Sequence, residues 1–244
     1  MTSRLRADRL LVERGLFASR AKAQAAIAAG LVTANDALVA RASDEIPVDA
    51  ILNAAPAYPW VSRGGVKLAA ALDHFKFDPH GRVCLDVGAS TGGFTDVLLK
   101  RGARRVYAVD VGRDQLHESL RRHSDVVSLE ATDIRGLDHA KLAEAPQVIV
   151  VDVSFISLKL VLPAALGLAS GPVSLVALIK PQFEAGRGGH LKKGIVRSAE
   201  VQARVCEDIA VFTRSLGLTI VGIIPSPIAG GDGNAEFLLG ARRD

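Results

Sequence analysis

Apolar residues recur at helical spacing near the start of the chain. The positions that carry this pattern are Leu10, Leu11, Leu16, Ala21, Ala25 and Ile27. Gly15 interrupts the pattern and Ser19 is a suitable N-cap where it resumes, so residues 4–29 predict two helices joined by a turn. A short β-hairpin with its turn at Asn35-Asp36 is expected to follow.

From residue 83 onward, aliphatic and β-branched runs alternate with helix-like segments. The expected strands cover residues 83–87, 106–111, 126–129, 148–153, 173–179, 219–224 and 235–241. The expected helices cover residues 93–100, 115–122, 158–168 and 198–216. This alternation predicts an α/β, Rossmann-like fold with a mostly parallel seven-stranded sheet. The last two strands follow each other without a helix, so the seventh is expected to be antiparallel.

A proline-containing stretch, APAYPW, separates the two patterns. It predicts a small N-terminal α+β domain at residues 1–54, a linker at 55–63 and a larger domain at 64–244. We expect Trp60 to dock the linker on a domain surface. Apolar residues make up 49% of the 244 positions and charged residues 23%, which is typical of a folded globular chain.

The net charge of +4 weakly favours a polyanionic partner. Cys84 and Cys206 are widely spaced, so the sequence predicts neither a disulfide framework nor a cysteine metal site, and it fits a reducing cytoplasm. The N-terminus does not read as a signal peptide, and no long unbroken apolar run predicts a spanning helix. We therefore expect no membrane association and no metal requirement.

The first expected strand of the larger domain leads directly into a glycine-rich turn. The turn, DVGASTGGFT, begins at Asp86 and contains Gly88 and Gly92, where glycine lets the backbone approach a ligand closely. Asp110 ends the next strand, where a carboxylate can accept hydrogen bonds from ribose hydroxyls. A glycine turn alone also serves simple geometry, but the two signals together predict a nucleotide site.

The same turn narrows the type of cofactor. Gly93 is followed by Phe94, so the Gly-Lys pair of a Walker loop is missing. The GxGxxG spacing of dinucleotide sites is also missing, and a carboxylate at Asp86 would repel a pyrophosphate. That carboxylate is compatible with the cationic sulfonium and amino groups of S-adenosylmethionine, which we favour. Asp133 is expected either at the adenine edge or as a helix N-cap.

Four charged residues fall where the carboxyl edge of the sheet is expected, and ligands of open α/β sheets collect at that edge. Asp152 ends the fourth strand, Lys180 ends the fifth, Glu236 begins the seventh, and Lys67 lies on a helix before the first. One interpretation is that Asp152 and Lys180 form only a satisfied ion pair. The other is that burial and neighbouring cations favour a neutral Lys180 amine that accepts the proton of a ribose 2′-hydroxyl. Lys67 then supports the attacking oxygen, and the two carboxylates orient the lysines.

Six motifs, in this order, carry a resemblance to a known family: SRGGVKL, DVGASTGGFT, AVDVG, VVDVSFISL, LIKPQFE and GNAEFLL. They resemble the TlyA (hemolysin A) family of bacterial ribosomal-RNA 2′-O-methyltransferases, whose catalytic part is similar to the FtsJ-like enzymes. The resemblance runs over nearly the whole chain. It implies a class I methyltransferase fold, S-adenosylmethionine as cofactor, and ribosomal RNA or ribosomal subunits as partner, with cytidine as the modified nucleoside.

The resemblance also implies roles for individual residues. Lys67, Asp152, Lys180 and Glu236 correspond to the family's catalytic tetrad. The cofactor-binding set expected from the turn and the resemblance is Asp86, Gly88, Ala89, Ser90, Gly92, Phe94, Asp110, Val111, Asp133 and Ile134. The N-terminal segment RADRLLVERGLFASRAKAQAAIAAGLV resembles the family's alpha-L RNA-binding motif, although Asn35-Asp36 replaces the usual Asn-Gly of its hairpin.

Basic residues in three places are expected to contact RNA phosphates, which supply affinity but little sequence information. They are Arg6, Arg14, Arg20 and Lys22 near the N-terminus, Arg63 in the linker, and Arg187, Lys192 and Lys193 in a glycine-rich segment after Lys180. A solvated charged face is the alternative interpretation for the N-terminal set. The segment at residues 184–197 is suited to closing over a target nucleotide.

Three other functions compete with RNA 2′-O-methylation. A non-catalytic ribosome-binding factor on the same fold would be expected to lose its cofactor residues, whereas Asp86, Gly88 and Asp110 are intact. A membrane-lytic protein would need an amphipathic or spanning element, which the sequence does not show. Methylation of a base or of a protein is less compatible with two lysines and two carboxylates. The modified nucleotide and the oligomeric state remain open at this stage.

Overall fold

The computed structural model describes residues 3–186, 191–192, 194–230 and 233–244 of the chain. The chain forms two compact units, residues 1–59 and residues 60–244. The division falls inside the expected linker. Each unit has a hydrophobic core of its own.

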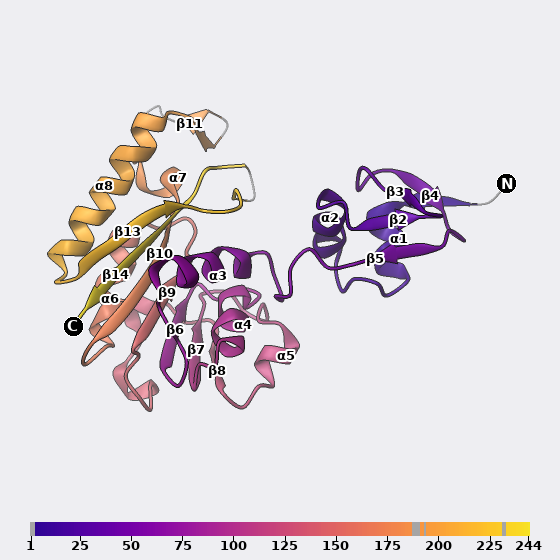
Figure 1. Cartoon of the computed structure of the whole chain (residues 1–244). Coiled ribbons are helices and arrows are strands. Elements are labelled where there is room, and N and C mark those ends of the chain that lie inside the picture. The colour runs from indigo at the N-terminus through magenta and orange to yellow at the C-terminus, as the bar shows by residue number, and fades with distance from the viewer. Residues whose placement is uncertain (1–2, 187–190, 193, 231–232) are drawn as a thin grey trace. The chain divides into compact units, whose positions relative to one another are not determined.

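The N-terminal unit packs two helices against short strands (Figure 1). Its elements are β1 (Arg4–Arg6), α1 (Ala7–Glu13), α2 (Arg20–Ala28), β2 (Val32–Ala34), β3 (Ala37–Leu38), β4 (Glu45–Pro47) and β5 (Leu52–Ala54). β1 pairs antiparallel with β4, and β2 lies between β3 and β5 in a second sheet. Leu10 and Leu11 of α1 and Ile27 of α2 are buried in its core.

Local signals explain the parts of this unit that were predicted. The Ser19 hydroxyl accepts a hydrogen bond from the Lys22 amide at 3.4 Å and caps α2. Asn35 and Asp36 have φ angles of 48° and 63°, the left-handed backbone that a tight hairpin turn requires. The helix pair and the hairpin are thus confirmed. The first helix begins at Ala7, so the prediction of helix at residues 4–6 was wrong: they form β1. β4 and β5 were not predicted, because three residues are too few to show an alternating pattern and no turn motif marks them.

The larger unit alternates strands and helices over most of its length. Its first half contains α3 (Gly64–Phe75), β6 (Val83–Val87), α4 (Gly93–Lys100), β7 (Arg105–Val109), α5 (Glu118–Arg121), β8 (Val126–Leu129), the 3-10 turns η1 (Ile134–Gly136) and η2 (His139–Lys141), and β9 (Val148–Val151). Its second half contains α6 (Leu158–Gly167), β10 (Val173–Ile179), α7 (Pro181–Glu184), β11 (Leu191–Lys192), β12 (Ile195–Val196), α8 (Ala199–Ser215), β13 (Thr219–Pro225) and β14 (Phe237–Arg243).

Seven of these strands form one sheet in the order β13-β14-β10-β9-β6-β7-β8. The pairs from β10 to β8 are parallel, and β14 is antiparallel to both β10 and β13. The predicted Rossmann-like α/β sheet with an antiparallel seventh strand is confirmed. β14 lies between two strands that precede it in the sequence, second from one edge of the sheet.

Helices cover both faces of this sheet (Figure 1). Leu85 and Ile149 pack with α6 and α8 on one face, whereas their neighbours Cys84 and Val148 pack with α3 and α4 on the other. Both faces are therefore buried, which explains why the strands read as continuous apolar runs. Each fully buried leucine or isoleucine contributes about 1.5–3 kcal/mol of transfer free energy.

Three predicted strand boundaries were wrong, and the errors matter for the site. β7 ends at Val109 and β9 at Val151, so Asp110 and Asp152 lie just beyond the strands. The Asp110 carboxylate accepts hydrogen bonds from the backbone amides of Ser90 (2.8 Å) and Gly112 (2.7 Å), which turns the chain away from the sheet. Glu236 precedes β14 instead of beginning it. Helix α5 is also shorter than predicted.

Candidate active site

A cleft lies at the carboxyl edge of the parallel strands, where β6, β7, β9 and β10 end. It consists of two adjoining hollows of about 430 Å³ each. Gly88, Ser90, Asp152, Ser154 and Phe155 line both hollows, so the two form one site. Its position agrees with the rule that ligands of open α/β sheets bind at this edge.

The glycine turn after β6 forms the floor between the two hollows. Gly88 has a φ of +84°, and a Cβ atom there would lie 2.3 Å from the backbone oxygen of Asp152. Gly92 has a φ of +93°, and its Cβ would collide with Leu120 at 2.2 Å. No other residue type fits these two positions without movement of the surrounding chain. Ala89 and Phe94, both predicted, are buried in the wall of the first hollow.

Asp86 lies beneath this turn instead of in it. It belongs to β6, is fully buried, and lines neither hollow. The Thr95 hydroxyl donates a hydrogen bond of 2.6 Å to its Oδ2, while its Oδ1 has no partner among the described residues. Burial, reinforced by the charges of Asp152 and Asp110, raises the pKa of Asp86 to about 7. Its place in the turn was therefore predicted wrongly.

The second hollow contains the remaining predicted cofactor residues. Asp110, Val111, Asp133 and Ile134 all line it. Val111 is exposed and Ile134 is buried, so together they present an apolar wall beside the Asp110 carboxylate. Asp133 caps η1, accepting the Arg135 amide, and pairs with the Arg135 guanidinium at 2.6 Å. The expected N-cap role of Asp133 is thus confirmed, and the residue also lines the second hollow.

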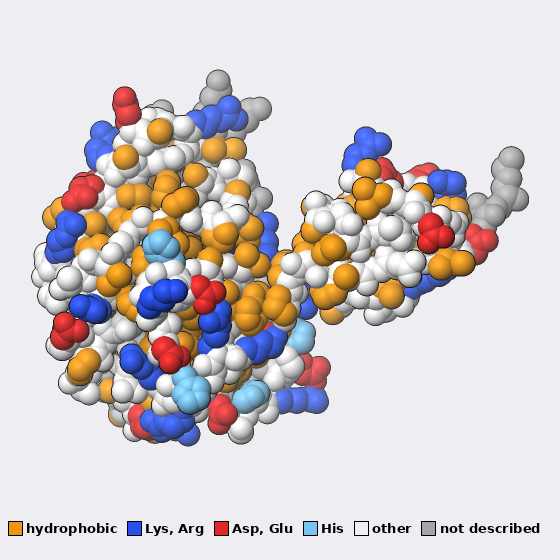
Figure 2. Space-filling model, in the orientation of Figure 1, with side chains coloured by type: hydrophobic (Ala, Val, Ile, Leu, Met, Phe, Trp, Pro, Cys, Tyr) orange, Lys and Arg blue, Asp and Glu red, His pale blue; other side chains and the backbone are white. Residues whose placement is uncertain are grey.

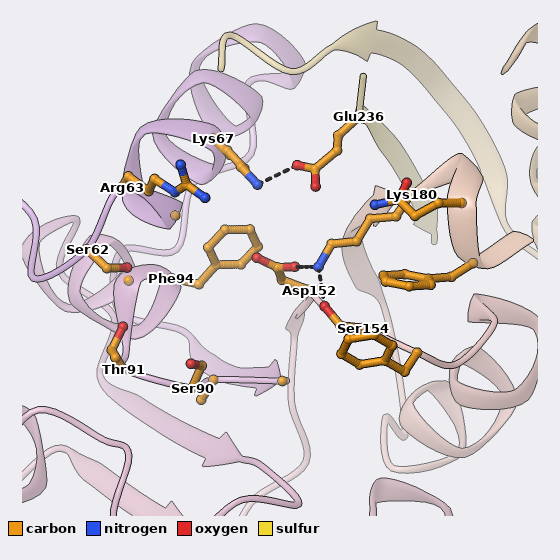
Figure 3. A pocket seen from close by; sticks show the side chains of 17 residues that line it. Ser62, Arg63, Lys67, Ser90, Thr91, Phe94, Asp152, Ser154, Lys180 and Glu236 are labelled. Carbon is orange, nitrogen blue, oxygen red and sulfur yellow. Dashed lines mark hydrogen bonds and ion pairs between the residues drawn. The ribbon is translucent and has the colours of Figure 1, made fainter. Parts of the chain in front are cut away.

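Two ion pairs occupy the first hollow, and Figure 3 shows both lysine side chains pointing into it. Lys67 of α3 pairs with Glu236, a contact that joins segments 169 residues apart. Lys180 Nζ lies 2.6 Å from Asp152 Oδ1, an ion pair whose angles fall outside those of a hydrogen bond. Lys67, Lys180 and Glu236 are each at most 9% exposed. The structure therefore gathers all four predicted residues in one pocket, three of them buried.

Several residues that line this hollow were not predicted, among them Ser154, Phe155 and Phe183. Ser154 Oγ accepts a hydrogen bond of 2.9 Å from Lys180 Nζ. Phe155 is 90% exposed, and its ring centroid lies 5.0 Å from that of Phe183. A positive φ of 64° at Phe155 is unusual for an aromatic residue. The nearness of Ser154 and Phe155 to Asp152 in the sequence was the available signal.

The start of α3 closes the hollow on the side opposite Lys180. Trp60 packs against Gly65, where a Cβ atom would lie 2.4 Å from the ring, and its ring lies 5.1 Å from Lys100 Nζ. The Val61 amide donates to Asp96 Oδ2 at 2.8 Å. These contacts hold the segment that places the predicted Arg63 at the rim of the hollow.

The comparisons with known proteins agree with this geometry. The family model of the FtsJ-like methyltransferase matches residues 60–243. The chain belongs to this family. It is 43% identical over 246 aligned positions to the 16S/23S rRNA (cytidine-2′-O)-methyltransferase TlyA of Mycobacterium tuberculosis, covering 99% of this chain and 91% of that protein.

Two further relatives show the same likeness across both units. Hemolysin A of Brachyspira hyodysenteriae is 39% identical, with 96% of this chain and 98% of that protein covered. A structure described as a "putative hemolysin" from Streptococcus thermophilus has a TM-score of 0.78 at 39% identity, covering 100% of this chain and 90% of that one. The resemblance to the TlyA and hemolysin A proteins is confirmed.

In this FtsJ-like methyltransferase, the N-terminal arginines predicted to contact RNA also have internal partners. Asp8 is fully buried and accepts hydrogen bonds from Arg6 (3.1 Å), Arg20 (2.8 Å) and Gln24 (2.7 Å). Arg14 donates to two backbone carbonyl oxygens. Arg6 and Arg20 keep about half of their side chains exposed, at 42% and 53%.

Of the other basic residues predicted to contact RNA, the structure describes some and not others. Lys22 is partly buried on α2. Arg187 and Lys193 lie outside the described residues, as does the side chain of Lys192 in β11. On the face shown in Figure 2, the basic side chains of residues 60–244 are interspersed with acidic and histidine side chains. Among the residues that the structure describes, no helix is long and apolar enough to cross a membrane.

Proposed function

We propose that the protein transfers a methyl group from S-adenosylmethionine to the ribose 2′-hydroxyl of a cytidine in ribosomal RNA. The observation that carries the proposal is the pairing of Lys180 with Asp152 and of Lys67 with Glu236 beside the glycine turn. The acceptor class is supported by the TlyA relative, which is named as an rRNA (cytidine-2′-O)-methyltransferase. Ribosomal RNA as substrate also implies a cytoplasmic location.

The second hollow fits this cofactor by shape and by chemistry. Gly88 lines both hollows without a side chain, which lets a ligand approach the backbone of the turn closely. Asp110 offers carboxylate oxygens to ribose hydroxyls, and Val111 with Ile134 offers apolar surface to an adenine ring. When bound, S-adenosylmethionine supplies a methyl group activated by the positive sulfonium. Ser90 and Asp152 line both hollows, so they mark the place where that methyl group would meet the acceptor hydroxyl.

The residues of the first hollow prepare the acceptor hydroxyl. Asp152 and Ser154 contact the Nζ atom of Lys180 from two directions. The lone pair of a neutral amine held in this way is left to face the hollow. A neutral Lys180 amine in this position accepts the 2′-hydroxyl proton as the oxygen becomes nucleophilic. Lys67, held by Glu236, places an ammonium group where negative charge develops on that oxygen. The burial of Lys67 and Lys180 strengthens these electrostatic interactions.

The test is transfer of a tritiated methyl group from S-adenosylmethionine to purified ribosomal subunits, with the product mapped by mass spectrometry. We expect a 2′-O-methylcytidine that Lys180→Ala reduces by about 10²–10⁴-fold. Lys180→Arg keeps the charge but does not accept a proton at neutral pH, so it should be equally inactive. Lys141→Ala changes an exposed lysine outside the cleft and should keep full activity. A methyl group on a base, or undiminished transfer by Lys180→Ala, contradicts the proposal.

A further inference from the structure

Glu184, at the end of α7, joins two walls of the first hollow. The Ser157 hydroxyl donates a hydrogen bond of 2.5 Å to its Oε2, and the Leu158 amide donates one of 2.7 Å to its Oε1. Ser157 is the N-cap of α6, where the first backbone amides lack partners within the helix. Glu184 therefore fastens the start of α6 to the short helix that follows Lys180.

The same two segments touch at three successive places. Lys180 stands at one end of the single turn of α7 and contacts Asp152 and Ser154. Phe183 packs on Phe155 in the middle. Glu184 closes the far end, on Ser157 and Leu158. Residues 152–158 and 180–184 thus run alongside each other, with the reactive lysine and Glu184 at opposite ends of the contact.

The segment held in this way carries backbone strain. Phe155 combines a φ of 64° with a side chain that is 90% exposed, so its own burial does not compensate for the left-handed backbone. Such conformations persist where the surrounding structure holds them. The hydrogen bonds that Ser157 and Leu158 make to Glu184 are the nearest such restraint on the following residues.

We propose that Glu184 is a positioning residue of the methyl-transfer reaction, which holds residues 152–158 against α7 and so keeps Asp152 and Ser154 in place around Lys180 Nζ. This inference rests on the proposed function and adds a residue that does not line the cleft itself. It acts through the lysine and not on the substrate.

The chemistry of Glu184 offers a conservative variant. Burial raises the pKa of this carboxyl, while the Leu158 amide and the Ser157 hydroxyl act in the opposite direction. Gln keeps an acceptor oxygen for the Leu158 amide without a buried charge, and its NH₂ group can donate to the Ser157 hydroxyl oxygen. Glu184→Gln should therefore keep the contacts with Ser157 and Leu158, and Glu184→Ala should remove them.

The experiment measures kcat, the KM for ribosomal subunits and the Kd for S-adenosylmethionine in both variants. We expect Glu184→Ala to lower kcat about tenfold to a hundredfold and to leave KM and Kd within about threefold, because the misplaced group is the base. Glu184→Gln should stay within about threefold of wild type in kcat. Asp138→Ala removes the N-cap of η2, which lines neither hollow, and is the control: its melting temperature should fall while its kcat does not.

A second readout does not depend on activity. Modification of Lys180 by an amine reagent, followed by mass spectrometry, should be faster in Glu184→Ala than in wild type, with Lys67 as the internal reference. If wild type methylates no ribosomal RNA but Lys180 labelling still rises, the proposed function fails and the positioning role stands. Wild-type kcat and labelling in Glu184→Ala, or a Glu184→Gln variant as impaired as Glu184→Ala, would overturn the inference.

Discussion

At the scale of single residues, the most consequential feature of this molecule is a small set of buried charged side chains. Lys67, Lys180 and Glu236 are almost completely buried, and removing one member of such a pair leaves an uncompensated charge that costs about 3–5 kcal/mol. Asp86 differs from them because, among the residues that the structure describes, its side chain has the Thr95 hydroxyl as partner and no cation. It is therefore the buried acid whose protonation state depends on pH near neutrality.

Asp86 makes stability depend on pH in a defined direction. Its pKa is about 7 in the folded chain and 3.8 ordinarily, so the folded state binds this proton more tightly. The resulting stabilisation is fully present below pH 4 and is lost as pH rises through 7. The free energy of unfolding of wild type should therefore fall, relative to Asp86→Asn, by up to about 4 kcal/mol between pH 4 and pH 9.

Urea unfolding of both proteins at several pH values measures this difference. Thr95→Val is the companion variant: without the Thr95 hydroxyl the pKa of Asp86 should rise further, which moves the loss of stability to higher pH. Parallel stability curves for wild type and Asp86→Asn would show that Asp86 does not titrate in this range.

At the scale of elements, a polar clamp holds the two N-terminal helices together. Asp8 lies in the first turn of α1, and its donors Arg20 and Gln24 lie on α2. Hydrogen bonds from Arg6 first, and then from Gln24 and Arg20, lower the pKa of Asp8. Its contribution to stability is therefore present above the ordinary pKa of the group and is lost as pH falls below it.

Asp8→Ala should destabilise the N-terminal unit by about 2–3 kcal/mol, because three donors lose a charged acceptor while both arginines can still reach water. Hydrogen exchange of the α1 and α2 amides should rise, and exchange of the amides in β6 and β9 should not. Exchange that rises in both units to the same extent would contradict a local clamp.

At the scale of the whole molecule, the two units have separate hydrophobic cores, and the cleft belongs to the larger unit. The buried residues of the N-terminal unit form one cluster, and the residues that line the cleft all come from residues 60–244. A chain that begins at Tyr58 keeps Trp60 and Val61 with their contacts at α3 and α4. It should therefore fold cooperatively on its own.

We expect this shortened chain to bind S-adenosylmethionine within about twofold of the full chain, since no cleft residue is removed. Its affinity for ribosomal subunits should fall about tenfold or more, with a shallower dependence on salt, because the basic residues of α1 and α2 are lost. Calorimetry for the cofactor and filter binding between 50 and 200 mM salt measure both. Unchanged affinity for subunits would assign RNA binding to the larger unit alone.

Much of the fold follows from local patterns. Continuous apolar strands separated by amphipathic segments predict a doubly wound sheet, and Ser19 and Asn35-Asp36 mark a helix start and a hairpin. Burying a charged residue at the end of an apolar strand costs free energy unless the charge is paired. The positions of Asp152 and Lys180 therefore predicted them as candidate site residues. These signals can be recognised from the sequence alone because each depends on residues only a few positions apart.

The tertiary structure decided which of these residues meet. The insertion of β14 between β10 and β13 brings Glu236 to Lys67, a partner 169 residues away that no periodicity encodes. A difference of one or two residues at a strand end moves a side chain across the sheet edge, which is why Asp86 lies under the cleft and Asp110 lies beside it. Glu184 escaped prediction for the same reason: its role is a contact across space, between two segments that only the folded sheet places side by side.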